Sequence, residues 1–312
     1  MRRNRGGLTM RAVCWFVCCV LQTLPLLAWA VANADMGTHP GFARGTPSAE
    51  PALPVELDAE GRLDWQCLRA SYPQITGLVS DAQGLWLLLQ DGKRVPYVQA
   101  SGQAEGEQDF WVTDVRSAMA DAYPLEPQRP DTPAGVAPGR RRSYALLEAM
   151  YGDSPEAVKA RLRPVVFFGQ RLWLTASAAS ALSRAESTLR PVVERDSALR
   201  RLLKTAGGFY WRRIAGEKRL SPHAYGIAFD ISPHIATYWR WSSLRPHPMQ
   251  KTYPQAIVQA LENEGFIWGG KWHEYDLMHF EYRPEIICKA RFGPQTMFPV
   301  RPNATTPATL GR

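Results

Sequence analysis

The chain has 312 residues, of which 45% are hydrophobic and 21% charged, and its formal net charge is +8. This length allows one large domain or two smaller ones, with ample sequence to bury a core. The basic residues form no Lys/Arg-rich stripe with interleaved aromatic residues, which argues against a nucleic-acid-binding protein.

The N-terminus has the pattern of a secretory signal. Four arginines precede an apolar run over residues 12–32, and the small-residue pattern ANA ends it. This predicts a signal peptide over residues 1–34, cleaved before Asp35, and an exported protein of the periplasm or cell envelope. A retained membrane anchor is the alternative, because the run is about long enough to span a bilayer. Pro25 and the small-residue exit favour cleavage, which would leave no stable span.

Loss of the signal changes both the charge and the cysteine content. The net charge falls from +8 to +4, because the signal contains four arginines and no acid, and this mildly basic balance suits an anionic wall polymer. Cys67 and Cys288 remain. An exported compartment permits a disulfide between them, and two buried thiols are the alternative.

The first predicted elements follow a leader over residues 35–55 that is rich in Gly, Pro, Ala and Ser. The segment LDWQCLRASYP, from Leu63, predicts a short helix. A Pro-rich stretch over residues 123–138 breaks regular structure and predicts a surface connection. Between the two lie candidate strands, the last two joined by an Asp-Gly hairpin turn: Ile75–Ser80, Leu85–Gln90 and Arg94–Val98.

The second half begins with a helix start at Ser154, which Pro and Glu follow. The segment RPVVFFGQRLWL predicts a strand. Residues 176–204 have a helical composition, with a break or kink at Pro191 and an end at the glycine pair that follows. A further helix is predicted over residues 254–264, with Gly265 as its stop.

The segment SPHAYGIAFDIS carries two candidate metal ligands, His223 and Asp230. They stand seven positions apart, so one straight strand would place them on opposite faces. The chain must therefore turn between them. Gly226 can adopt the backbone angles needed, and IAFDIS is then a buried strand that carries Asp230.

The segment GGKWHEYDLMHFEYRPE supplies the second half of the site. Apolar and polar residues alternate in MHFEYR, which is the period of a strand, so His279 and Glu281 share a face. Glu281 is expected to orient His279 or to pair with Arg283. An exposed polar face with a salt bridge is the alternative.

Two imidazoles and one carboxylate, from His223, His279 and Asp230, suit a catalytic zinc site that leaves a fourth position open for water. Asp276 stands three residues before His279 and is the candidate general base of a hydrolytic reaction. Glu274 is the competing base, although it lies in a polar turn further from the strand.

These residues carry a resemblance to a known family. SxHxxGxAxDI, GFxWGGxW and DxMHFEYRPE resemble the zinc D-Ala-D-Ala carboxypeptidases of the VanY type, which include phage endolysins that cut L-Ala-D-Glu bonds. WRRIAGEKRLSPH, PGRRR and EAMYG extend the likeness upstream, over most of the mature chain. The resemblance implies an α+β fold over residues 140–300, with a small, mostly antiparallel central sheet and packed helices, as in hedgehog domains. It leaves residues 56–139 as an N-terminal region and 301–312 as a tail.

The resemblance also implies roles for individual residues. It makes Asp276 the general base, Arg212 the residue that fixes the substrate carboxylate, and Ser221 a substrate contact. The residues themselves barely separate Arg212 from Arg213. The zinc ion is implied to be held by His223, Asp230 and His279.

The function implied is hydrolysis of a peptide bond in peptidoglycan stem peptides, with removal of the terminal D-Ala as the leading hypothesis. An L-Ala-D-Glu endopeptidase is the alternative within the enzyme class. The alternative outside the enzyme class is a non-catalytic wall-binding module with a structural zinc. The presence of Asp276 argues against this module. Residues 56–139 would pack on the catalytic domain or bind wall polymer separately. Three tryptophans are expected to line the walls of a cleft: Trp211, Trp268 and Trp272. For Trp268, packing in the core is the favoured alternative.

Overall fold

The computed structural model describes residues 55–99, 113–125, 132–232 and 236–293, all within one compact unit. Helices and small antiparallel sheets make up this part of the chain, so the predicted α+β fold is confirmed. The predicted signal peptide and tail, and the leader up to residue 54, lie outside the described residues. Within the described ranges, no helix is long and apolar enough to cross a bilayer.

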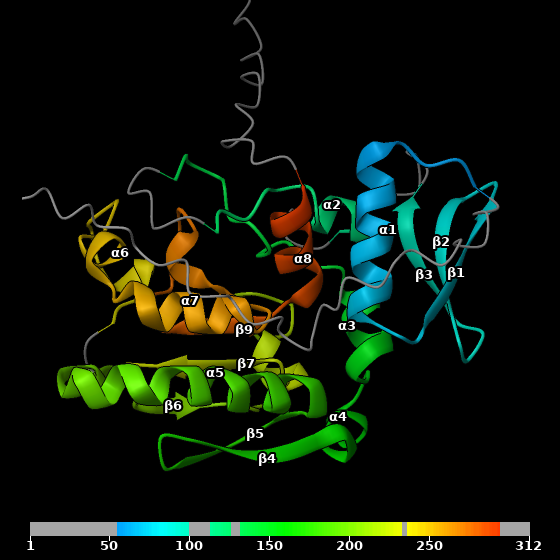
Figure 1. The fold of residues 1–312 in the computed structure, drawn as a ribbon. Helices are drawn as coiled ribbons and strands as arrows, with labels where there is room; N and C mark the ends of the chain where they lie inside the picture. The colour runs from blue at the N-terminus through cyan, green and yellow to red at the C-terminus, as the bar shows by residue number, and fades with distance from the viewer. Residues whose placement is uncertain (1–54, 100–112, 126–131, 233–235, 294–312) are drawn as a thin grey trace, which may run out of the picture. The chain divides into compact units, whose positions relative to one another are not determined.

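The N-terminal region forms a helix and a three-stranded antiparallel sheet (Figure 1). Helix α1 (Ala59–Ser71) begins after Asp58, whose side chain accepts a hydrogen bond from the Gly61 N–H at 2.7 Å. The N-terminal sheet has the order β1-β2-β3, with β1 (Ile75–Asp81), β2 (Gly84–Leu89) and β3 (Arg94–Gln99). The predicted strands and hairpin turn are confirmed, and Gly92 of the turn has a φ of 82°.

Short helices connect this sheet to the second half of the chain: α2 (Val115–Ala118), α3 (Tyr144–Tyr151) and α4 (Pro155–Arg161). Helix α4 starts as predicted, because the Ser154 hydroxyl accepts a hydrogen bond from the Ala157 N–H at 3.3 Å. The described residues of the Pro-rich stretch, 123–125 and 132–138, contain no helix or strand, as predicted.

The segment RPVVFFGQRLWL forms two strands, so the prediction of a single strand was wrong. Strands β4 (Leu162–Phe167) and β5 (Gln170–Thr175) pair as an antiparallel hairpin. The turn uses Phe168 at a φ of 46° and Gly169 at 84°. A non-glycine residue at positive φ is uncommon, which explains why the sequence gives only a weak turn signal here.

The helix predicted over residues 176–204 ends earlier than expected. Helix α5 (Ala176–Arg195) passes through Pro191 without ending, because Leu189 and Val193 on either side stay buried in the core. The chain leaves the α-helix at Asp196, whose side chain accepts a hydrogen bond from the Ala198 N–H at 3.1 Å and starts a 3₁₀ helix, η1 (Ser197–Leu203).

A four-stranded antiparallel sheet of order β6-β7-β9-β8 lies at the centre of the second half, and we call it the C-terminal sheet. Its strands are β6 (Thr205–Gly207), β7 (Ala228–Ile231), β8 (Phe266–Trp268) and β9 (His279–Tyr282). Helix α7 (Gln255–Asn263) follows Pro254 as predicted, and Gly265 stops it at a φ of 95°. The remaining elements are α6 (Met249–Thr252), α8 (Pro284–Phe292), η2 (Pro222–Tyr225), η3 (Trp239–Trp241) and η4 (Gly269–Lys271).

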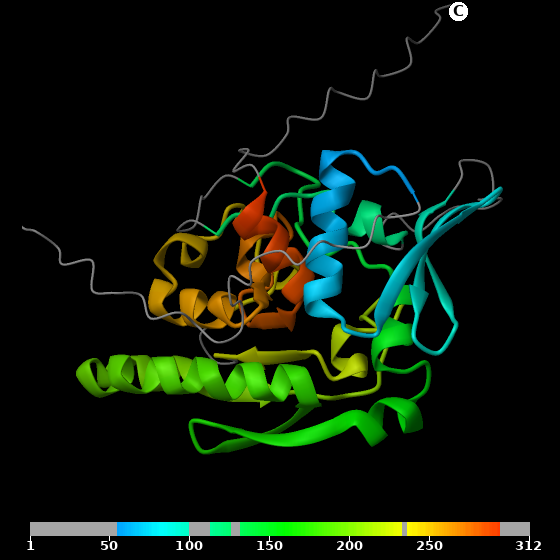
Figure 2. The same ribbon diagram turned by 45° about the vertical axis from the view of Figure 1, so that its right-hand side comes forward.

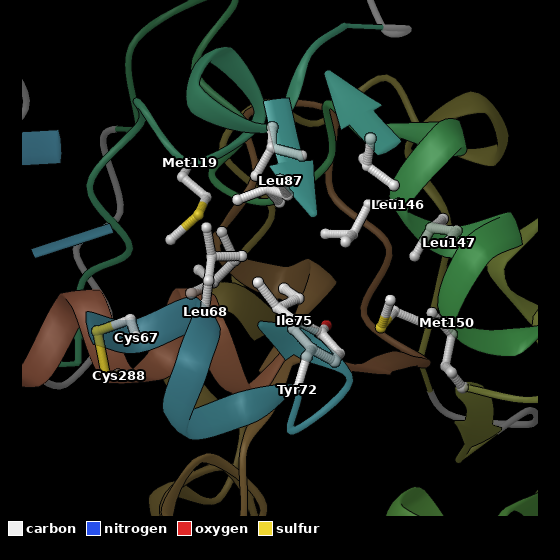
Figure 3. Close-up of a cluster of buried hydrophobic side chains, with 14 of the residues drawn as sticks. Cys67, Leu68, Tyr72, Ile75, Leu87, Met119, Leu146, Leu147, Met150 and Cys288 are labelled. Atoms are coloured by element: carbon white, nitrogen blue, oxygen red, sulfur yellow. A yellow bond between two sulfur atoms is a disulfide. The ribbon is translucent and has the colours of Figure 1, made fainter. Parts of the chain in front are cut away.

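Two hydrophobic clusters bury these elements. The N-terminal core, part of which Figure 3 shows, includes Leu68, Ile75, Leu87 and Leu147. The second cluster includes Leu182, Phe229, Leu261 and Phe280. Helices α1 and α8 lie side by side (Figure 2), and a disulfide between Cys67 and Cys288 joins them. Of the two alternatives for these cysteines, the structure therefore has the disulfide.

Candidate metal centre

Three candidate metal ligands converge from the 3₁₀ helix η2 and two paired strands. His223 lies on η2, Asp230 on β7 and His279 on β9. Asp230 and His279 are direct partners in the antiparallel pair β7–β9, so their side chains lie on the same face. One ligand atom from each of the three residues lies within 4.8 Å of the other two.

The turn that brings His223 to the strands is built by its neighbours. The buried Ser221 begins η2, and its hydroxyl accepts a hydrogen bond from the His223 N–H at 3.4 Å. Gly226 ends η2 at a φ of 64°, which places the predicted turn where the sequence indicated. A Cβ atom at this position would lie 2.5 Å from Cδ2 of Leu162, so only glycine fits without displacing a neighbour.

The spacing of the donor atoms fits a zinc ion. Nε2 of His223 lies 3.3 Å from Oδ1 of Asp230, and Nδ1 of His279 lies 3.2 Å from the same oxygen. Tetrahedral zinc with bonds of about 2.0–2.1 Å to nitrogen and oxygen would separate neighbouring ligand atoms by about 3.3–3.4 Å. Two imidazoles and one carboxylate are also the ligand types that zinc takes in catalytic sites.

A hydrogen bond to the outer nitrogen fixes each imidazole. Nδ1 of His223 lies 2.8 Å from the carbonyl oxygen of Gly208, which accepts its proton and leaves Nε2 as the metal-binding atom. Nε2 of His279 lies 3.4 Å from Oε2 of Glu281, so Nδ1 of His279 faces the centre. The two rings therefore present different nitrogen atoms to the same point.

Glu281 is completely buried, which excludes the exposed polar face considered from the sequence. It makes both of the contacts expected of it, because Nη1 of Arg283 lies 3.4 Å from Oε1. Its strongest partner was missed: Arg142 donates from Nε to Oε1 at 2.9 Å and from Nη2 to Oε2 at 2.5 Å. Burial disfavours the Glu281 carboxylate, but Arg142 outweighs it and holds the pKa of Glu281 well below its usual range.

Contacts between the donors stabilise the charged forms of Asp230 and His279. Burial disfavours the Asp230 carboxylate, but the charges and hydrogen bonds of His223 and His279 hold the pKa of Asp230 well below its usual range. Burial also disfavours a charged His279, whereas its hydrogen bonds to Asp230 and Glu281 raise the pKa of His279 to about 9. Both imidazoles therefore face the same oxygen of Asp230, which is the arrangement that one shared cation requires.

Asp276 lies just before β9, within electrostatic reach of all three donors. Its Oδ1 accepts a hydrogen bond from the Met278 N–H at 3.3 Å. Burial raises the pKa of Asp276 to about 6, and the Asp230 carboxylate adds to this against the attraction of His279. The competing base, Glu274, instead forms an ion pair with Arg140.

The predicted substrate residues lie on the approach to η2. Arg212 is exposed, and its carbonyl oxygen accepts a hydrogen bond from the Ser221 N–H at 2.9 Å. Within the described part of the chain, its side chain hydrogen-bonds the carbonyl oxygen of Arg213 and none of the three donors, so the roles of Arg212 and Ser221 stay predictions. Trp268 is completely buried in the second core, whereas the Trp272 ring centre lies 5.8 Å from that of His279.

Residues 215–282 match the model of a protein family described as D-alanyl-D-alanine carboxypeptidase. This segment holds the three donors and Asp276, so the resemblance found in the sequence is confirmed there. Arg142 and Arg212 lie outside it. No curated protein and no solved structure matches the chain.

Proposed function

We propose that this protein is a zinc-dependent peptidase that removes the terminal D-Ala from peptidoglycan stem peptides. The observation that carries the proposal is the convergence of His223, Asp230 and His279, whose ligand atoms lie within 4.8 Å of one another, inside the segment that matches the carboxypeptidase family. Asp276 beside this set supports a hydrolytic role rather than a structural one, because a structural site needs no additional carboxylate.

The three donors and Asp276 have different roles in the proposed hydrolysis. When bound, zinc supplies Lewis-acid chemistry that polarises the scissile carbonyl and makes water more acidic. His223, Asp230 and His279 hold the ion. Asp276 takes a proton from the attacking water and delivers it to the leaving nitrogen, so the peptide bond breaks as the new carbon–oxygen bond forms.

Arg212 and Ser221 would position the peptide. The guanidinium of Arg212 is exposed, and its only hydrogen bond within the described residues goes to the carbonyl oxygen of Arg213 at 3.5 Å. An Arg in this state is available to bind the terminal carboxylate of a peptide through two parallel hydrogen bonds. Such a contact would select an end of the chain, as a carboxypeptidase requires.

The proposed place of action is the periplasm or cell envelope, where stem peptides occur. The N-terminal signal pattern supports export. The disulfide between Cys67 and Cys288 is compatible with it, because such bonds persist in oxidising compartments.

Mass spectrometry of a defined stem pentapeptide, incubated with the protein and zinc, tests the proposal. We expect the loss of one alanine mass, its absence after chelation, and its return when zinc is restored. An internal cut would assign the protein to the endopeptidases instead. Tight zinc binding without any cleavage would leave a zinc-containing binding module as the function.

A further inference from the structure

A chain of buried charged groups connects the metal centre to the N-terminal region. It runs from His279 through Glu281, and from there to Arg142 and Arg283. Arg283 donates to Glu285 at 2.6 Å, and Glu285 accepts a hydrogen bond from the hydroxyl of Tyr72 at 2.7 Å. Tyr72 directly follows α1, so the connection joins elements from opposite ends of the described chain.

We infer that Arg142 is a positioning residue for the metal centre: it holds Glu281, which in turn holds the imidazole of His279 in the orientation that binds zinc. This inference rests on the metal centre of the proposed function. It goes beyond that proposal because Arg142 lies outside the segment that matches the family.

The geometry of the Arg142–Glu281 pair supports this role. Two nitrogens of one guanidinium donate to the two oxygens of one carboxylate, at 2.9 and 2.5 Å. Arg142 is 3% exposed and Glu281 is completely buried, so solvent does not screen the pair. The planar fork of an arginine fixes the plane of the carboxylate, which the single ammonium of a lysine cannot do.

Arg142 is itself held in place. Its Nη1 donates to the carbonyl oxygen of Arg140 at 2.8 Å, and the next residue, Ser143, caps α3. Arg283 also donates to Glu281 Oε1, at 3.4 Å, and to the carbonyl oxygen of Gly139 at 2.7 Å. Glu281 is thus contacted by two arginines, and each of them is hydrogen-bonded to the segment that precedes α3.

Loss of Arg142 would reach the metal through Glu281. The carboxylate would lose the two parallel hydrogen bonds that fix its plane and would keep only the longer contact with Arg283. A carboxylate free to rotate no longer holds its oxygen against Nε2 of His279. Outer partners of ligating histidines typically change metal affinity by about 10–100-fold when they are mutated.

The test is the zinc dissociation constant, measured by competition with a chelator, together with the visible spectrum of the cobalt(II)-loaded protein. The variants are Arg142→Gln, Arg142→Lys and Glu281→Gln. Glu262→Gln is the matched control, since Glu262 is also a buried, salt-bridged carboxylate, paired with Lys271 at 2.6 Å and bonded to Tyr123 at 2.6 Å. The control makes the same chemical change without touching a metal ligand.

We expect zinc binding to weaken by about 10–100-fold in Arg142→Gln and Glu281→Gln, by less in Arg142→Lys, and not at all in the control. The cobalt spectrum should change in the first two variants, because the His279 ring reorients. If Arg142→Gln does not fold, as judged by circular dichroism, Arg142→Lys decides in the same way.

Unchanged zinc affinity and an unchanged cobalt spectrum in the folded Arg142 variants would overturn the inference. So would an equal loss of affinity in Glu262→Gln, because the effect would then be one of general stability. If the unmodified protein binds neither zinc nor cobalt, both ideas fail: the metal centre of the proposed function and the positioning role of Arg142. The failure of one idea is therefore distinguishable from the failure of both.

Discussion

The N-terminal sheet and the C-terminal sheet bury their strands in different ways. In the N-terminal sheet buried residues alternate with more exposed ones, as at Leu87 and Leu89 of β2 and at Val95 and Tyr97 of β3. This is the pattern of an antiparallel sheet with one face toward a core and one toward solvent. In the C-terminal sheet, β8 is buried along its whole length, and β9 is buried from His279 to Glu281.

Charged side chains differ between the two sheets for the same reason. Asp81 and Arg94 of the N-terminal sheet form an ion pair at 2.8 Å with side chains 36% and 50% exposed, so water screens the two charges. Glu281 has no access to water, and removing the partner of such a buried charge costs about 3–5 kcal/mol. The exposed pair is therefore expected to matter little for stability, whereas Glu281 depends on its arginine partners.

The largest expected effect that sharpens this contrast is that of Asp276→Asn on the reaction rate. Removal of the proposed general base should lower kcat on a stem pentapeptide by about 10²–10⁴-fold. Zinc affinity and thermal stability should stay unchanged, because Asn keeps the shape of the side chain and its acceptor for the Met278 N–H. A variant that keeps its full rate would show that another group takes the proton.

Removal of the disulfide tests the N-terminal side of the comparison. The double substitution Cys67→Ala, Cys288→Ala should lower the free energy of unfolding by about 2–5 kcal/mol, measured by urea denaturation. The rate and zinc affinity of the folded protein should change little, because neither cysteine contacts a metal ligand. A loss of activity without loss of stability would break the division between the two regions.

Gly226→Ala should have a smaller effect on stability but a distinct effect on the metal. An alanine at a φ of 64° costs about 1–2 kcal/mol in folding free energy. Its Cβ would also overlap Leu162, and relief of this overlap should move His223 and weaken zinc binding. Gly169→Ala is the matched control, because Gly169 also has positive φ, at 84°, but its Cβ would meet no atom within 4 Å. Equal zinc affinity in both variants would contradict this account of Gly226.

The smallest expected effect is that of Ser154→Ala, at the start of α4. Loss of the cap on the Ala157 N–H should cost about 1 kcal/mol of unfolding free energy and leave zinc affinity unchanged. Ser154→Asp should retain most of the stability, because Asp caps helices equally well. If both variants lose the same stability, the hydrogen bond of the cap is not the cause.

Local sequence patterns predicted much of the fold, but they did not predict pairings between residues far apart in the chain. The alternation in MHFEYR and the turn at Gly226 predicted β9 and the path from His223 to Asp230, because both depend on neighbouring residues. The β4–β5 hairpin was missed, because its turn places Phe168 at a positive φ, and a phenylalanine gives no sequence signal for that conformation. The end of α5 was misplaced at the glycine pair, because the α-helix already ends at Arg195 and Asp196 begins a 3₁₀ helix.

The same limit applies to the site. The three donors could be proposed from two short segments, but Arg142 stands 139 positions from Glu281. Its run of three arginines looks uniform, yet Arg140 pairs with Glu274, Arg141 with Asp121 and Arg142 with Glu281. The three arginines are identical in type and adjacent in sequence. Only the folded structure shows which carboxylate each of them contacts.

The disulfide between Cys67 and Cys288 has a consequence for the protein after proteolytic cleavage. The two cysteines stand 221 positions apart, so a single protease nick anywhere between them leaves both fragments attached. The nicked protein would run as one band on a gel without reducing agent and as two bands after reduction. The fragment that carries α1 could not diffuse away from the one that carries α8.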